Sequence, residues 1–322
     1  MRRRTARSLR VRLFGTVSLT LAGRPLPPFP TRRSEALFAF LALHTRRPCR
    51  REELADAFWR DRPEAVARKC LRTELWRARS VVEPDGVSAG TFLTVSRAGI
   101  ALNREADVWI DVVELERAAA SMVDRNGHEL GDAERSALAS AIDLYSGDLL
   151  EGHDYEWCVS RRELLRSLHQ TALERLIEDA LRHDEWRQTV LLALRLLARE
   201  PLLEHVHRSL MRAYRGLGEP GLALRHYRAL RDLLRSELDI EPMPETAALA
   251  AAIQAGGSPP AETARPGRAA GDGVRHLVAR LRSLCTDLRR ASARLDAMIE
   301  RLEPSAARSA RALLQSRGGF RL

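Results

Sequence analysis

Cations recur at helical spacing between residues 67 and 82, in the stretch ARKCLRTELWRARSVV. At about 100° per residue, a helix through this stretch has two distinct faces. Its apolar face would hold Ala67, Cys70, Leu71, Leu75, Ala78, Val81 and Val82, and its polar face Arg68, Lys69, Arg72, Thr73, Trp76, Arg77, Arg79 and Ser80. Guanidinium, ammonium and hydroxyl groups on one face can bind phosphate oxygens and base edges. These residue types therefore predict a surface that recognises a polyanion.

An ordinary solvated helix face is the alternative interpretation. Such a face usually mixes both signs of charge, because opposite charges four residues apart stabilise a helix and like charges destabilise it. Here Arg68 and Arg72 stand at that spacing, and the face carries five cations and no acid, while Glu74 falls on the apolar side. The single sign of charge, with Trp76 among the cations, favours a negatively charged partner.

The positive charge of the chain is concentrated at its N-terminal end. The 322 residues are enough for two domains and carry a net charge of +10. Residues 1–82 contain 20 basic residues against seven acidic ones, so the rest of the chain has a slight negative balance. Such localised basicity is typical of nucleic-acid binding, although an anionic membrane surface could also attract it.

Several kinds of chemistry are not expected. Lysine occurs once, at Lys69, without the preceding glycines of a nucleotide-binding P-loop. The four cysteines form no C-x-x-C pair, and the nine histidines show no metal-ligand spacing with them. We therefore expect no catalytic residue, no metal and no cofactor. No apolar segment follows the basic N-terminus, and ALFAFLAL is too short to cross a bilayer, so we expect a cytoplasmic, nucleoid-associated protein.

The elements around the basic helix form a recognisable order. Alternating strands in LRVRLFG and VSLTL turn through Gly15, helices are expected at 34–44, 51–59 and 63–82, and TFLTVS and IALN form a second hairpin around Arg97. After a basic tail at 1–8, residues 9–106 are thus predicted to be a winged helix-turn-helix domain of α+β type. In that motif the basic third helix lies in the DNA major groove.

The predicted docking assigns two sets of DNA-binding residues. On the third helix, four residues would face base edges or flanking phosphates: Lys69, Arg72, Thr73 and Arg77. Arg68 would hold phosphate near the start of that helix. Cations at helix starts and at the wing tip would hold phosphates without recognising sequence: Arg32, Arg33, Arg51 and Arg97. Trp76 has two interpretations. It could pack over the wing or the next domain, which we favour, or lie against sugar and phosphate.

The stretch from Arg47 to Arg79 resembles the DNA-binding domain of the Streptomyces antibiotic regulatory protein (SARP) family. It matches the family pattern R-P-x-x-R-E-E-L, a Trp, and A-R-x-x-L-R-x-x-L-x-R-x-R nearly throughout. Two departures stand out. Arg50 replaces the usual Ser at the N-cap of the second helix, which should cost about 1 kcal/mol, and AGIAL replaces a more usual Gly-Tyr wing tip. The resemblance implies a winged helix of the response-regulator output type.

Residues 107–254 are expected to be entirely helical and tetratricopeptide-like. Leu210, Tyr214, Ala223 and Tyr227 stand at the spacing by which small and large residues interlock paired helices. With GDLLEGHDYEWC before it and ELDIEPMPET closing it, this segment resembles the family's bacterial transcriptional activator domain. The resemblance implies an activator that binds tandem promoter repeats as a homodimer or head-to-tail oligomer. It would recruit RNA polymerase through the sigma and alpha subunits.

The remaining residues extend beyond that two-domain pattern. Residues 255–273 are predicted to be a linker, 274–303 a coiled-coil helix with a heptad stripe, and 304–322 a mobile basic tail. The stripe could pair with a second copy or dock on the helical domain. For the whole chain, the predicted function is sequence-specific transcriptional regulation. The alternative is a helical-repeat interaction scaffold with a vestigial winged helix.

Overall fold

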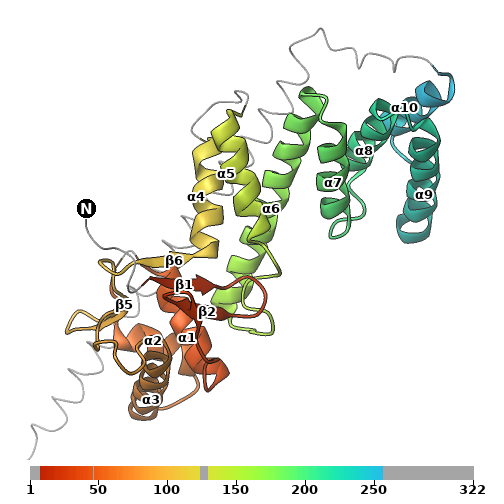
Figure 1. Ribbon diagram of the computed structural model, residues 1–322. Coiled ribbons are helices and arrows are strands. Elements are labelled where there is room, and N and C mark those ends of the chain that lie inside the picture. The colour runs from red at the N-terminus through yellow and green to blue at the C-terminus, as the bar shows by residue number, and fades with distance from the viewer. Residues whose placement is uncertain (1–7, 46, 124–129, 257–322) are drawn as a thin grey trace, which may run out of the picture. The chain divides into compact units, whose positions relative to one another are not determined.

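The computed structural model describes residues 8–45, 47–123 and 130–256. Within them the chain forms two compact units (Figure 1). The first contains residues 8–114 and 144–165, and the second contains residues 115–143 and 166–256. The predicted basic tail before residue 8, almost all of the linker, the coiled-coil helix at 274–303 and the tail at 304–322 lie outside the described residues.

The first unit begins with a four-stranded sheet in the order β3-β2-β1-β6. The predicted hairpin is confirmed: β1 (Leu9–Arg12) and β2 (Ser18–Leu21) pair antiparallel, and β3 (Arg24–Pro25) follows β2. The strand β6 (Val108–Ile110) pairs parallel with β1, which corrects the prediction of unbroken helix from residue 107. Its Val, Trp and Ile side chains suit a pleated surface with one buried face, and pairing with β1 outweighs the helical periodicity that follows.

Three helices and a second hairpin complete the winged helix as predicted. The helices are α1 (Arg32–Leu43), α2 (Arg51–Trp59) and α3 (Glu64–Val82). The hairpin pairs β4 (Leu93–Val95) with β5 (Ile100–Leu102). At the start of α2, where Arg50 offers no side-chain cap, Glu53 Oε2 accepts a hydrogen bond of 2.8 Å from the Arg50 backbone N–H. Half of a capping box is therefore present despite the departure at Arg50.

Residues 144–165 pack within the first unit, although the sequence analysis assigned them to the helical domain. The indole of Trp157 meets Phe40 of α1 edge-on, with ring centroids 5.1 Å apart, and Tyr155 meets Phe58 of α2 at 4.9 Å. Tyr145 packs on Phe14 at 4.7 Å. These aromatic contacts join segments far apart in sequence, so periodicity along the chain could not predict them.

The second unit is helical, as expected. Its residues come from α4 (Asp111–Val123), α5 (Asp132–Asp143), α6 (Glu156–Arg182), α7 (Trp186–Leu197), α8 (Glu204–Gly216), α9 (Pro220–Leu238) and α10 (Pro244–Gln254). Leu210 and Ala223 are fully buried, and Tyr214 and Tyr227 pack against the core cluster that contains Ala223. The predicted interlocking of α8 with α9 is therefore confirmed.

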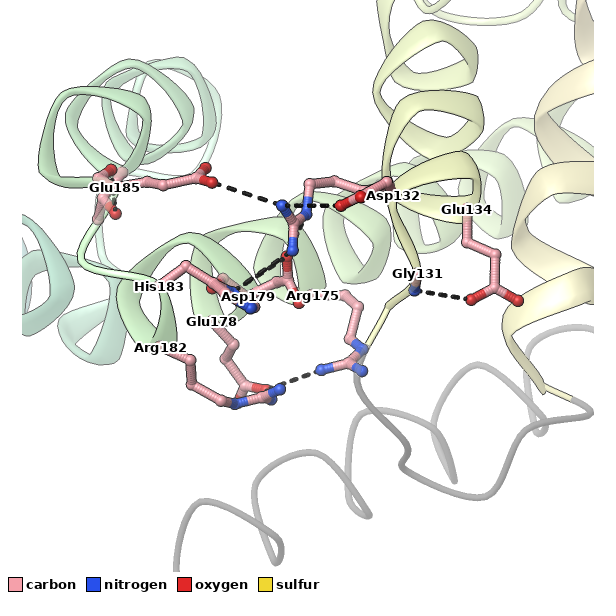
Figure 2. A network of polar contacts seen from close by, with 11 residues as sticks. Gly131, Asp132, Glu134, Arg175, Glu178, Asp179, Arg182, His183 and Glu185 are labelled. Carbon is pink, nitrogen blue, oxygen red and sulfur yellow. Dashed lines mark hydrogen bonds and ion pairs between the residues drawn. The ribbon is translucent and has the colours of Figure 1, made fainter.

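A buried polar network joins α5 to α6 (Figure 2). Arg135 Nε lies 2.6 Å from Asp179 Oδ2, and Arg135 Nη1 lies 3.4 Å from Glu185 Oε1. Asp179 is buried, with 1% of its side chain exposed. Because a buried carboxylate is costly without a cation, this pair fixes how the two helices meet.

Candidate nucleic-acid interface

The two predicted faces of α3 are present. Ala67, Leu71, Ala78, Val81 and Val82 are buried, whereas Arg68, Lys69, Arg72, Thr73 and Trp76 are exposed. Leu75 and Cys70 are half-buried at the margins. We call the side of α3 formed by Arg68, Lys69, Arg72, Thr73, Trp76 and Arg77 the outer face.

Charge on the outer face is more focused than the sequence predicted. Arg68 Nη2 lies 3.1 Å from Glu52 Oε1 and 2.6 Å from Glu64 Oε1. Arg77 Nη1 lies 2.7 Å from Glu74, and Arg79 Nε lies 3.1 Å from Glu83. The predicted polar face of five cations without acids, which also includes Arg79, is therefore corrected: acids contact three of those five cations. Glu64, Glu74 and Glu83 each stand three or four residues along the chain from the cation they contact. Only Glu52 comes from another helix, α2, which a projection of α3 alone cannot show.

Lys69 and Arg72 make no ion pair within the described residues, and both are exposed. They stand next to Thr73, whose hydroxyl donates to the Lys69 carbonyl oxygen at 3.2 Å. With the hydroxyl bonded along the helix, Thr73 offers its methyl group to a partner, as contact with a thymine methyl requires. These three neighbours are the part of the outer face best suited to base edges.

Trp76 does not pack as we expected. Its side chain is 68% exposed, the most exposed large hydrophobic residue of the described chain. The prediction that it packs over the wing or the next domain is wrong for the described residues. A large flat apolar ring among cations is suited to lie on sugars and bases of a nucleic acid.

The wing is held against the start of α2. Cys49 and Ile100 form an isolated β-bridge, and Gly99, directly before Ile100, has a φ of +142°. A Cβ atom at Gly99 would lie 2.3 Å from the Cys49 carbonyl oxygen, so only glycine fits this close approach. Arg51 Nη1 donates to the Ser96 carbonyl oxygen at 3.3 Å, and Arg97 at the tip is exposed. The structure therefore brings Arg51 and Arg97 to one region.

The other two predicted phosphate contacts have partners in residues 144–165. Arg32 donates to the carbonyl oxygen of Gly152, and Arg33 lies 6.0 Å from the ring centroid of Trp59. Burial raises the pKa of Tyr155, and the charge and hydrogen bond of Arg33 oppose that rise. Arg32 and Arg33 are exposed residues, but their guanidinium groups contact other residues of this chain. Sequence reasoning missed this, because residue 152 is distant along the chain.

Glu83, which the sequence analysis did not single out, joins α3 to the wing. Its carboxylate accepts backbone N–H groups of Gly90, Phe92 and Leu93 at 2.8–3.1 Å, besides pairing with Arg79. Burial acts to raise the pKa of Glu83, but these hydrogen bonds outweigh it and lower the pKa below the usual 4.5. The only sequence signal is its place as the first residue of the turn EPDG.

Neither a metal site nor a membrane span is found where the structure can be described. No three histidine, cysteine or acidic side chains of these residues gather as metal ligands. None of their helices combines the length and apolar composition needed to span a bilayer.

The fold and the outer face define a winged helix-turn-helix protein with a helical-repeat domain. Residues 110–254 match the family model described as the bacterial transcriptional activator domain. Regulatory protein AfsR of Streptomyces coelicolor is 30% identical over 213 residues, covering 66% of this chain and 21% of AfsR. Transcriptional regulatory protein MoaR1 of Mycobacterium tuberculosis is 25% identical over 248 residues, covering 76% of this chain and 79% of MoaR1.

The structure resembles that of Mycobacterium tuberculosis EmbR in complex with a low-affinity phosphopeptide. The TM-score is 0.61 at 19% identity, covering 85% of this chain and 69% of that chain, which supports the shared fold. The chain spans about a fifth of the length of S. coelicolor AfsR and 24% of the S. griseus protein, which is 27% identical. These matches agree with the resemblance to the SARP family of transcriptional regulators that the sequence carries.

Proposed function

We propose that this chain is a transcriptional activator that binds duplex DNA in a sequence-specific manner through α3. One observation carries the proposal: Lys69 and Arg72 are exposed side by side on the outer face and make no ion pair in the described residues. Two neighbouring cations without acids are poised for phosphates or for the O6 and N7 atoms of guanine. The AfsR and MoaR1 names support a regulatory role.

Each predicted DNA-binding residue has a defined task in this proposal. Lys69, Arg72 and Thr73 contact base edges, and Trp76 lies on the backbone beside them. Arg51 and Arg97 hold phosphates at the wing. Four further cations reach phosphates only after giving up the internal partners described above: Arg68, Arg77, Arg32 and Arg33. Each of them therefore contributes less to DNA affinity than an unpaired cation.

Activation would follow from recruitment, as in the family the chain resembles. Two or more copies would bind tandem direct repeats as a homodimer or head-to-tail oligomer. The helical domain would stabilise contacts with the sigma and alpha subunits of RNA polymerase. Such a protein would act in the cytoplasm, at the nucleoid.

A mobility-shift assay over a salt series tests DNA binding on fragments upstream of neighbouring genes. Arg72→Ala should weaken binding to the preferred fragment by about 1–3 kcal/mol, that is about 5- to 150-fold, if Arg72 contacts a base. Arg24→Ala is the matched control, because Arg24 is exposed on β3, away from α3. Equal affinities of Arg72→Ala and the wild-type chain would contradict the proposed docking.

In-vitro transcription from the shifted promoter tests activation. The proposal expects more transcript on addition of the chain, and repression would contradict it. If no fragment is shifted at low salt, the chain fits the alternative of an interaction scaffold with a vestigial winged helix.

A further inference from the structure

The outer side of the N-terminal sheet carries a polar groove that the proposed DNA contacts do not use. Strand β1 alternates, so Leu9 and Val11 are fully buried while Arg10 and Arg12 are exposed. The groove has a volume of about 640 Å³, and Arg10, Arg12, Ser18, Thr20 and Asp107 are among its lining residues. Its walls include the turn at Ala22 and Gly23.

The strand register places cations and hydroxyls in pairs. Arg10 is directly opposite Thr20, and Arg12 is directly opposite Ser18, so these four side chains share one face of the sheet. The Arg10 guanidinium lies over the indole of Trp109, 5.1 Å from the ring centroid. An arginine stacked in this way is oriented before a ligand arrives, which lowers the entropy lost on binding.

We propose that this groove binds an acidic peptide segment of a partner protein. Two guanidinium groups that alternate along one strand match carboxylates that alternate along an extended peptide. The groove lies open on a sheet face, which suits an extended peptide better than a small molecule, because small-molecule sites enclose most of their ligand. Asp107 is the single acid among the lining residues, so cations outnumber acids there by two to one.

The chain's own ends do not offer that charge. Residues 1–7 read MRRRTAR, and residues 304–322 contain four arginines and no acid. Both segments would be repelled by Arg10 and Arg12. The proposal therefore assigns the groove to an acidic segment of another protein and not to these two basic segments.

The groove and the outer face of α3 are separate surfaces of the first unit. They share no residue, and in Figure 1 the strands β1 and β2 lie on the other side of α1 from α3. Peptide binding and DNA binding can thus be measured independently. A failure of either leaves the other interpretable.

Fluorescence anisotropy of a labelled peptide of alternating glutamate and glycine tests the proposal on the full chain. The double substitution Arg10→Glu with Arg12→Glu should weaken peptide binding by about tenfold or more, because two charge-assisted contacts become repulsive. Arg10→Lys with Arg12→Lys should retain most of the affinity. The matched control Arg24→Glu, in the same sheet but outside the groove, should change it less than about twofold.

Further measurements separate the groove from other surfaces. The same peptide with glutamine in place of glutamate should not bind. Binding should persist when duplex DNA that the chain shifts is present in excess, and the double Glu variant should melt at the wild-type temperature by circular dichroism.

Unchanged peptide affinity in a folded double Glu variant would overturn the proposal. So would displacement of the peptide by DNA, which would assign the peptide to α3. The proposal is also overturned if the wild-type chain binds no peptide while the double Glu variant loses self-association, because the face would then bind a second copy of the chain.

Discussion

Glu74 of α3 accepts a hydrogen bond from the hydroxyl of Thr31, the N-cap of α1. The same hydroxyl accepts a hydrogen bond of 3.1 Å from the Ser34 backbone N–H. Thr31 therefore caps the first turn of α1 and also contacts α3. Glu74 is buried, with 8% of its surface exposed, and its other oxygen pairs with Arg77. The acid that seemed misplaced on the apolar side of α3 therefore joins two helices of the winged domain.

Replacing Glu74 should loosen this junction. Glu74→Ala removes the carboxylate that accepts from the Thr31 hydroxyl and pairs with Arg77, and should lower the free energy of unfolding by about 1–3 kcal/mol, measured by urea denaturation. Glu74→Gln keeps an acceptor and should lose less. Glu64→Ala, on an exposed side of the same helix, is the control. Equal stability of Glu74→Ala and Glu64→Ala would show that the buried contact contributes nothing.

Acids that contact Arg68 should limit DNA affinity. The double substitution Glu52→Gln with Glu64→Gln frees Arg68 from both ion pairs, so affinity for duplex DNA of any sequence should rise. The slope of log affinity against log salt should steepen by about one, since one more phosphate is neutralised. Arg68→Ala added to that double variant should cancel the gain. A gain confined to one DNA sequence would mean that Arg68 contacts a base.

Trp76 and Trp59 of the winged domain should respond to substitution in opposite ways. Trp76→Ala should change the free energy of unfolding by no more than about 0.5 kcal/mol, because the ring is 68% exposed, yet weaken DNA binding. Trp59→Ala removes a ring that is 4% exposed and should destabilise by about 3–5 kcal/mol. Chemical denaturation and mobility shifts measure both effects. A large stability loss in Trp76→Ala would restore the packing interpretation.

The ion pair between Arg135 and Asp179 should be essential to the helical unit. Arg135→Met leaves the Asp179 carboxylate buried without its cation and should lower the free energy of unfolding by about 3–5 kcal/mol. Asp132→Asn is a close control: Asp132 Oδ1 lies 3.8 Å from the same arginine, but its side chain is fully exposed. Thermal and urea melts should show no measurable change for that control. Similar losses in both variants would contradict a special role for burial.

Glu83 should make the stability of the winged domain depend on pH. Its pKa is lowered in the folded state, so its contribution is present above pH 4.5 and is lost as the pH falls through the folded pKa. Glu83→Gln should therefore be less stable than the wild-type chain at pH 7. The difference should shrink below pH 4.5 in urea melts across a pH series. A difference independent of pH would show that Glu83 acts through shape and not charge.

Local patterns predicted most of the secondary structure. The hairpin of β1 and β2, the helices α1 to α3 and the wing follow from alternation, from helical spacing and from turn residues such as Gly15, signals that act over a few residues. The strand β6 was missed because three residues before a long helix carry too little pattern. Only its partner β1, about a hundred residues earlier, makes it a strand.

The sequence by itself determined which residue types lie on the outer face of α3, because a helix repeats every 3.6 residues whatever surrounds it. The tertiary structure decided which of those cations remain without an acid. Arg68 meets Glu52 of α2, Arg77 meets a glutamate held by Thr31, and Arg32 meets the carbonyl of Gly152, whereas Lys69 and Arg72 stay exposed. Ion pairing depends on distances of a few ångströms between atoms, and packing between distant segments sets those distances.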